Sequence, residues 1–243
     1  MSVFLNEQQH YDMDIVLPCY NPPSNFIETL AQRFADIQSC YPKKAFRLIV
    51  SNDGSTRNFG IKEKEALRTT FPSAIIIDNR KNRGKGTAVR AGIAASNAAY
   101  TVYTDIDFPY SLESMCEVID KTFDNIDVVI AVRNNSYYSK LTPLRKLMSR
   151  GSRLMNQVVL RMENTDTQGG LKGLSPKARK IMLQTKIKDF LFDTEFIVLA
   201  ARNSDTTIMN VETDLREEIV MSRMSIGVLM RESINFIKIA GLR

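Results

Sequence analysis

Short apolar runs alternate with helical patterns through the first half of the chain. Runs rich in β-branched and aromatic residues predict strands at 13–20, 46–53, 73–79, 100–107 and 127–133. These runs are apolar throughout rather than alternately apolar and polar, which is typical of parallel strands covered by helices on both faces. The order strand–helix–strand therefore predicts an α/β fold with a mostly parallel central sheet flanked by helices. Ligand-binding loops are expected at the carboxyl ends of the strands.

Capping residues and helical spacing locate the helices between these strands. Ser24 is predicted to cap a helix whose apolar residues include Leu30 and Phe34, and Ser111 to cap a helix that contains Met115. Residues 85–97 are predicted to form a short alanine-rich helix.

The second half of the chain is less regular. We expect a long helix at 144–160, a strand at 169–175, a helix that starts at Pro176, a buried helix at 190–202 and a strand at 206–213. No internal repeat or linker interrupts the pattern. The chain is therefore interpreted as an N-terminal leader (1–12), one domain (13–215) and a C-terminal helical extension (216–243).

Composition narrows the function classes. The 243 residues carry a formal net charge of +6, which favours an anionic partner such as a phosphate-bearing substrate. The single histidine, His10, lies in the polar leader, which excludes histidine triads and multi-histidine metal sites. Three cysteines without a CxxC pattern indicate a reducing cytosol rather than a disulfide framework. The basic residues are dispersed and match no nucleic-acid-binding motif, so no nucleic-acid partner is expected.

Membrane signals are weak in this sequence. It contains no apolar stretch long enough for a transmembrane helix and no signal peptide, which predicts a cytoplasmic protein. Methionines, isoleucines and basic residues share the segment 221–243. This segment either lies on an anionic membrane, which would make the protein peripheral at the inner face, or packs on the domain or in a homodimer interface.

The pattern Thr104-Asp105-Ile106-Asp107 ends the fourth predicted strand and is the strongest chemical signal. Residues two apart on a strand point the same way, so both carboxylates are expected on one side. Paired carboxylates with substrate phosphates suit Mg²⁺ or Mn²⁺. For the tripeptide alone, a polar turn with two solvated acids is the alternative.

Two further polar segments follow the second and third predicted strands. In the first, 51–56, Asp53 can accept hydrogen bonds from a base or ribose, and Gly54 permits a tight turn. In the second, 82–87, small residues and Lys85 open a helix whose N-terminus favours phosphate. Its spacing matches neither GxxxxGK[ST] nor GxGxxG, which disfavours kinase and dehydrogenase functions. The alternative for 51–56 is an ordinary turn, and the alternative for 82–87 is a basic capped turn.

Together these motifs resemble family two of the inverting glycosyltransferases, which have the GT-A fold. The matching segments are 15–21, 52–55, 82–86 and 105–107. Within that family the chain looks most like dolichyl-phosphate mannose and glucose synthases and bacterial polyprenyl-phosphate glycosyltransferases. That narrower likeness rests on 131–133, 166–172 and 192–195, and the whole resemblance covers roughly residues 13–215.

The resemblance implies roles for individual residues. Asp107 would be the principal metal ligand, and Asp105 would contact the nucleotide sugar and help to hold the metal. Asp107 and Asp166 would be catalytic, and Asp166 would position or deprotonate the acceptor. Arg133 and Lys172 would neutralise the diphosphate or an acceptor phosphate. The residues implied to bind the nucleotide sugar are Pro18, Tyr20, Asn21, Asp53, Lys85, Asp105, Arg133 and Lys172. Asp193 and Glu195 either orient the site or form a buried polar pair.

The implied reaction transfers a hexose from a UDP- or GDP-linked sugar to polyprenyl or dolichyl phosphate, with inversion and with Mg²⁺ or Mn²⁺ as cofactor. Transfer to a soluble glycan or another hydroxyl acceptor is one alternative, and a non-catalytic nucleotide-sugar-binding module is another. Two features depart from the resemblance. Pro22 stands where the subgroup usually has an acidic residue, and the QxxRW signature of processive synthases is missing, which favours a single transfer over polymerisation.

Overall fold

The computed structural model describes residues 10–133 and 169–216, together with Asn235 and Ile239. The elements in chain order are β1 (Met13–Cys19), α1 (Phe26–Cys40), β2 (Phe46–Asp53), α2 (Ile61–Thr70), β3 (Ile75–Asn79), α3 (Lys85–Ala95), β4 (Tyr100–Tyr103), α4 (Leu112–Phe123), β5 (Val128–Arg133), β6 (Lys172–Leu174), α7 (Pro176–Met182), α8 (Phe192–Arg202) and β7 (Ile208–Thr213).

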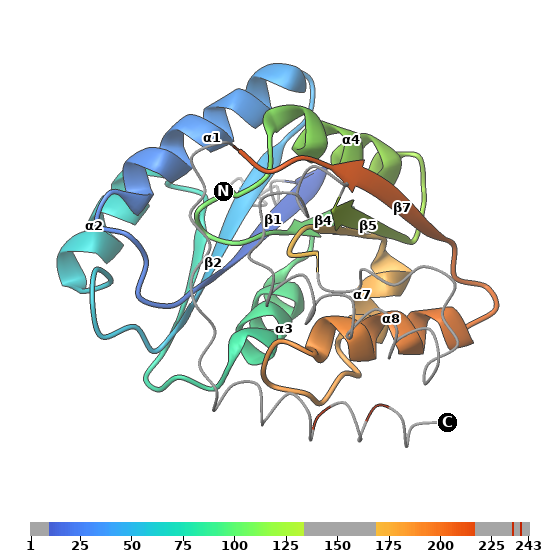
Figure 1. Ribbon diagram of the computed structural model, residues 1–243. Helices are drawn as coiled ribbons and strands as arrows, with labels where there is room; N and C mark the ends of the chain where they lie inside the picture. The colour runs from blue at the N-terminus through green and yellow to red at the C-terminus, as the bar shows by residue number, and fades with distance from the viewer. Residues whose placement is uncertain (1–9, 134–168, 217–234, 236–238, 240–243) are drawn as a thin grey trace, which may run out of the picture.

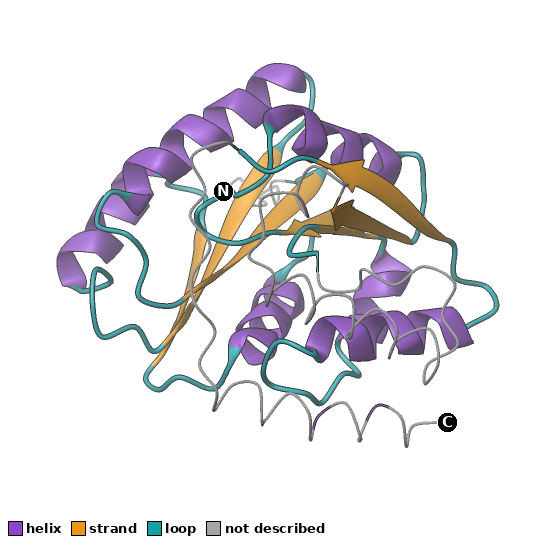
Figure 2. Ribbon diagram, viewed as in Figure 1, coloured by secondary structure: helices purple, strands orange, loops and turns teal. Residues whose placement is uncertain are grey.

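The described strands form one sheet in the order β3-β2-β1-β4-β6-β5-β7. Every neighbouring pair is parallel except the two that involve β6, which runs antiparallel to β4 and β5. Helices α1, α2 and α4 lie on one face of the sheet, and α3, α7 and α8 lie on the other (Figures 1 and 2). The predicted α/β fold with a mostly parallel, helix-flanked sheet is confirmed.

Two buried apolar clusters explain why the strands are apolar throughout. In β1, Ile15 and Leu17 pack with Leu30 of α1 on one face, while Val16 packs with Phe192 of α8 on the other. Alternate side chains of a strand point to opposite faces, so a strand covered on both sides needs apolar residues at consecutive positions.

A buried ion pair anchors the C-terminal end of α3. Arg47 of β2 donates two hydrogen bonds to Asp14 of β1, at 2.8 and 2.9 Å, and the Asp14 carboxylate is fully buried. The same carboxylate accepts from Ser96 Oγ at 2.7 Å, and Ser96 is the C-cap of α3. This end of α3 is therefore tied to the amino ends of the strands, opposite the end that begins at Lys85.

Several predicted elements occur with shifted bounds. The predicted cap at Ser111 and the predicted helix start at Pro176 are confirmed, since Ser111 Oγ accepts from Ser114 N and α7 begins at Pro176. The predicted helix at 190–202 begins two residues later, and the strands predicted at 169–175 and 206–213 are β6 and β7. The helix predicted at 144–160 lies outside the described residues.

Three expectations differ from the structure. The predicted cap at Ser24 is wrong, because Phe26 N donates to Pro23 O at 3.2 Å in a tight turn, and Asn25 becomes the N-cap. The predicted strand at 100–107 ends at Tyr103. Helix α2 was not predicted, because it buries only Leu67 and so has almost no apolar periodicity.

Candidate active site

The candidate site lies at the carboxyl ends of β1, β2 and β4. Strand β1 has β2 on one side and β4 on the other. The helices that follow β1 and precede β4, α1 and α3, cover opposite faces of the sheet (Figure 1). Ligands of open α/β sheets bind where the strand order reverses in this way, beyond the carboxyl ends of the strands.

A turn after β4, rather than a strand, brings Asp105 and Asp107 together. Phe108 N donates to Asp105 O at 3.0 Å, and Phe108 has a φ of 45° and a buried ring. Strand alternation was expected to place both carboxylates on one side. This explanation is wrong, because β4 ends at Tyr103 and a turn positions both residues. The two carboxylates still interact. Burial, and then the nearby Asp105 charge, raise the pKa of Asp107.

Lys85 neutralises part of this negative charge. Its Nζ lies 2.6 Å from Asp105 Oδ1, and its side chain is 19% exposed. Burial opposes the ammonium form, but the carboxylates of Asp105, Asp193 and Asp107 together raise the pKa of Lys85. The basic start of α3 and the acidic turn therefore meet in the structure.

Gly170 covers the other side of the Asp105 carboxylate. A Cβ at Gly170 would lie 2.8 Å from Asp105 Oδ2 and 3.8 Å from Lys85 Nζ. A residue with a side chain would push the carboxylate away from its present position. The turn that precedes β6 therefore sets where Asp105 points.

Arg216, which the sequence analysis did not single out, adds a positive charge beside the acidic turn. Its guanidinium donates to Asp107 O at 2.9 Å, and its backbone N donates to Pro109 O at 2.9 Å. Its charge acts to lower the pKa of Asp107, against the larger effect of burial. No motif marks Arg216, because only the return of the chain after β7 brings it here.

Asp53 clamps the loop that leads into α3. Its two carboxylate oxygens accept from Arg83 N and Gly84 N, both at 2.8 Å, and its side chain is buried. Gly84 is the N-cap of α3 and has a φ of 98°, which favours glycine. Burial raises the pKa of Asp53, although both amides act to lower it. Asp53 therefore has a structural role, and contact with a base or ribose stays a prediction.

Residues after β1 organise a second loop of the site. Asn21 Oδ1 accepts from Thr56 N at 2.8 Å and Arg57 N at 3.1 Å, and Asn21 N donates to Ser55 Oγ at 2.8 Å. Asn21 thus holds the loop that follows Asp53. Tyr20 is 51% exposed beside it and is available for a ligand. Pro18 lies inside β1, paired in register with Ser51, and is buried.

Lys172 and Asp193 form a buried ion pair beneath the acidic turn. Lys172 Nζ lies 2.8 Å from Asp193 Oδ1 and donates to Gly169 O at 2.6 Å. Tyr103, the last residue of β4, donates its hydroxyl to Asp193 Oδ1. Burial, and then the Asp193 charge, raise the pKa of Tyr103 well above its usual value. Lys172 is fully buried and has a structural role in this ion pair. Neutralisation of a phosphate by Lys172 stays a prediction.

Of the remaining predicted residues, Glu195 has described side-chain contacts, whereas only the backbone of Arg133 is described. Arg133 is the last residue of β5, in register with Thr213 of β7. Asp166 lies outside the described residues. Glu195 braces the loop before α8, because its Oε2 accepts from Lys186 N and Ile187 N at 2.8 Å. Asp193 and Glu195 are both buried but serve different contacts rather than pairing with each other.

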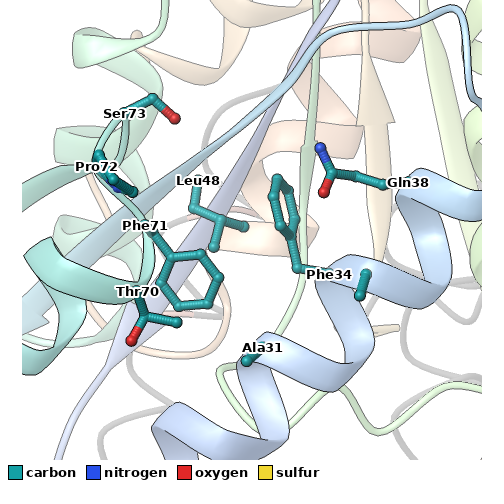
Figure 3. A pocket seen from close by; sticks show the side chains of 9 residues that line it. Ala31, Phe34, Gln38, Leu48, Thr70, Phe71, Pro72 and Ser73 are labelled. Carbon is teal, nitrogen blue, oxygen red and sulfur yellow. The ribbon is translucent and has the colours of Figure 1, made fainter.

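A separate hollow of about 280 Å³ lies between α1 and the α2–β3 connection (Figure 3). Phe34 and Phe71 meet edge to face in it, with ring centroids 5.8 Å apart. Its lining contains no ionisable side chain. The hollow reaches β2 at Leu48, near the start of that strand, so it is distinct from the site at the carboxyl ends.

The acidic turn fits a divalent cation only with help from a substrate. No group of three or more His, Cys, Asp or Glu side chains arranged to hold a metal occurs among the described residues. Asp105 and Asp107 supply hard oxygen ligands, and such sites are commonly completed by substrate phosphates. A metal bound jointly with a diphosphate therefore suits this site better than a metal bound by protein alone.

A parallel sheet with carboxylates at the end of its fourth strand and a basic helix start beside them defines the GT-A class of glycosyltransferases. The model of the family "Glycosyl transferase family 2" matches residues 14–181. The chain belongs to this family and is a glycosyltransferase.

Curated relatives are similar along most of the chain. A dolichyl-phosphate beta-glucosyltransferase of Trichomonas vaginalis is 26% identical over 239 residues, which cover 93% of this chain and 69% of the relative. A dolichyl-phosphate beta-glucosyltransferase of Saccharomyces cerevisiae is 25% identical over 222 residues, covering 82% and 66%. The chain thus spans about two thirds of the length of these relatives.

Solved structures share the fold. Glucosyl-3-phosphoglycerate synthase from Mycobacterium tuberculosis, solved with Mn²⁺, UDP and glucosyl-3-phosphoglycerate, has a TM-score of 0.60 and 16% identity, covering 95% of this chain and 80% of that one. Mannosyl-3-phosphoglycerate synthase from Rubrobacter xylanophilus has a TM-score of 0.62 and 13% identity, covering 95% and 73%. At these identities the likeness establishes the GT-A fold alone.

Proposed function

We propose that the protein transfers a hexose from a UDP- or GDP-linked donor to the phosphate of a polyprenyl or dolichyl phosphate, with inversion at the anomeric carbon. The observation that carries the proposal is the acidic turn at Asp105 and Asp107, paired with Lys85. The relatives named dolichyl-phosphate beta-glucosyltransferases support this acceptor class. Among the described residues, no helix is long and apolar enough to cross a membrane.

In this proposal Asp107 and Asp105 hold Mg²⁺ or Mn²⁺, and Lys85 contacts the donor diphosphate. The metal would neutralise negative charge on the diphosphate leaving group. Lys85 and Arg216 add positive charge near the same place, which favours departure of an anion. The exposed Tyr20 ring and the loop held by Asn21 lie where the nucleoside would bind, at the ends of β1 and β2.

The chemical nature of the acceptor determines whether the transfer needs a general base. A lipid phosphate is already an anion at neutral pH and attacks the anomeric carbon with its own oxygen. A hydroxyl acceptor must lose a proton, and Asp166 is the residue proposed to take it. Arg133 and Lys172 stay proposed contacts for phosphate, and binding at the inner face of a membrane is part of the same proposal.

The test is transfer of labelled sugar from UDP-glucose or GDP-mannose to dolichyl phosphate, with Mg²⁺ or Mn²⁺. Asp107→Asn is expected to abolish formation of the lipid-linked sugar, whereas Asp36→Asn, which changes an acid on α1 paired with Arg33, leaves it unchanged. A parallel reaction with soluble sugar acceptors tests the alternative that the sugar is transferred to a hydroxyl group. Donor binding without transfer to any acceptor would indicate a non-catalytic module.

A further inference from the structure

The contact between Lys85 and Asp105 occupies a carboxylate that the proposed function assigns to a metal. Asp105 Oδ1 is taken by the ammonium group at 2.6 Å, and Oδ2 faces Gly170. A divalent cation needs one of these oxygens and is repelled by a neighbouring ammonium group. The Asp105 side chain is still 38% exposed, so a metal that arrives alone can approach it but must compete with the ammonium group of Lys85.

The position of Lys85 explains why the pair forms. Lys85 is the first residue of α3, where the helix dipole is positive and a cation is disfavoured unless an anion lies beside it. Asp105 is that anion in this structure. A diphosphate at the same place would supply more negative charge than one carboxylate and would suit the helix N-terminus as well.

The surroundings let the ammonium group move while the carboxylate stays. The clamp by Asp53 holds the backbone of Arg83 and Gly84 directly before Lys85. The lysine side chain itself is a flexible four-carbon stem. Gly170 limits the motion of Asp105 on the opposite side.

We propose that Lys85 is an exchangeable internal cation: it holds Asp105 in the donor-free protein and passes to the donor diphosphate, so that Asp105 is released to the metal only with the donor. The inference rests on the proposed function. It makes metal and donor bind as a pair, and it prevents the acidic turn from filling with free divalent ions. A permanent structural brace is the competing role for the same ion pair.

The test measures Mn²⁺ binding by electron paramagnetic resonance of the free ion, with and without UDP or GDP. The variants are Lys85→Met, which removes the charge at similar length, and Lys85→Gln, which keeps a hydrogen-bond donor. Lys121→Met is the matched control, because Lys121 pairs with the exposed Asp124 on α4 at 3.3 Å. Circular dichroism melting checks that each variant is folded.

We expect both Lys85 variants to bind Mn²⁺ alone about ten-fold more tightly than the wild type and to bind nucleotide alone more weakly. The enhancement of Mn²⁺ binding by nucleotide should shrink by a similar factor, because the variants lack the ammonium group that passes from Asp105 to the diphosphate. Lys121→Met should match the wild type. Unchanged or weaker Mn²⁺ binding in folded Lys85 variants would overturn the inference and leave the proposed function standing. A wild type that binds neither nucleotide nor Mn²⁺, even together, would refute both.

Discussion

The fully buried ammonium group of Lys172 lies 2.8 Å from Oδ1 of Asp193, and Tyr103 donates to the same carboxylate oxygen. The pair joins β6 to the first turn of α8, and the Asp193 charge also acts on Lys85 in the candidate site. Since Lys172 also donates to Gly169 O, it connects this buried charge to the turn that contacts Asp105 through Gly170.

Breaking this pair should be strongly destabilising. Lys172→Met leaves the Asp193 carboxylate buried without its cation, which costs about 3–5 kcal/mol of unfolding free energy. Urea denaturation followed by circular dichroism measures the loss. Lys121→Met is the control, because Lys121 pairs with the exposed Asp124 and its loss should cost about 1 kcal/mol or less. Similar losses in the two variants would show that the buried pair contributes no more than a surface one.

Gly170→Ala should impair activity while leaving the fold intact. The added methyl group would lie 2.8 Å from Asp105 Oδ2, so the carboxylate must move. A displacement of this kind at a reacting centre lowers the transfer rate by about 10- to 100-fold. Initial rates at saturating donor measure the effect. In Gly60→Ala the nearest atom is the flexible end of Glu63 at 3.2 Å, and this control should keep wild-type rates. Equal rates in both variants would contradict the role given to Gly170.

Asp53→Asn should loosen the start of α3. A side-chain amide has one acceptor oxygen, so it can serve only one of the amides of Arg83 and Gly84. The unserved donor costs about 1 kcal/mol or more. Hydrogen exchange at Arg83 and Gly84 should become faster, and Lys85 should lose part of its preference for Asp105. If exchange at these two amides is unchanged while nucleotide binding falls, Asp53 acts on the ligand and not on the loop.

The three cysteines should differ in reactivity with iodoacetamide. Burial raises the pKa of Cys19 to about 12, although Ser55 acts to lower it. Burial, and then the neighbouring Cys40 thiol, raise the pKa of Cys116 to about 12. Only a thiolate reacts, so at pH 8 about one molecule in 10⁴ is reactive at either position, and both react faster as the pH rises.

Cys40 is exposed and should be alkylated first. Peptide mass spectrometry should therefore find a single modified cysteine in the native protein at pH 8 and three in denaturant. Cys40→Ser should abolish the native modification. Rapid alkylation of Cys19 would instead show that the end of β1 opens to solvent.

Patterns between near neighbours in the chain could be predicted. The apolar runs of β1, β2 and β5 reflect burial on both faces of a sheet, and the cap at Ser111 and the helix start at Pro176 reflect preferences within one helical turn. Helix α2 was not predicted, because it is mostly exposed and its sequence therefore has little apolar periodicity. The acidic pair was found for its composition, although a turn and not a strand positions it.

The amino-acid sequence by itself determined the class of fold, the order of most strands and helices and the residue types of the acidic candidate site, because each depends on local periodicity and local chemistry. Only the tertiary structure decided that Lys85 pairs with Asp105, that Arg216 returns beside Asp107 and that Lys172 is buried against Asp193. These partners are far apart in the chain, and tertiary contacts bring them together, such as the pairing of β6 with β4 and the bridge between Tyr110 and Leu215. Contacts of that kind depend on which strands pair, and local periodicity contains no information about it.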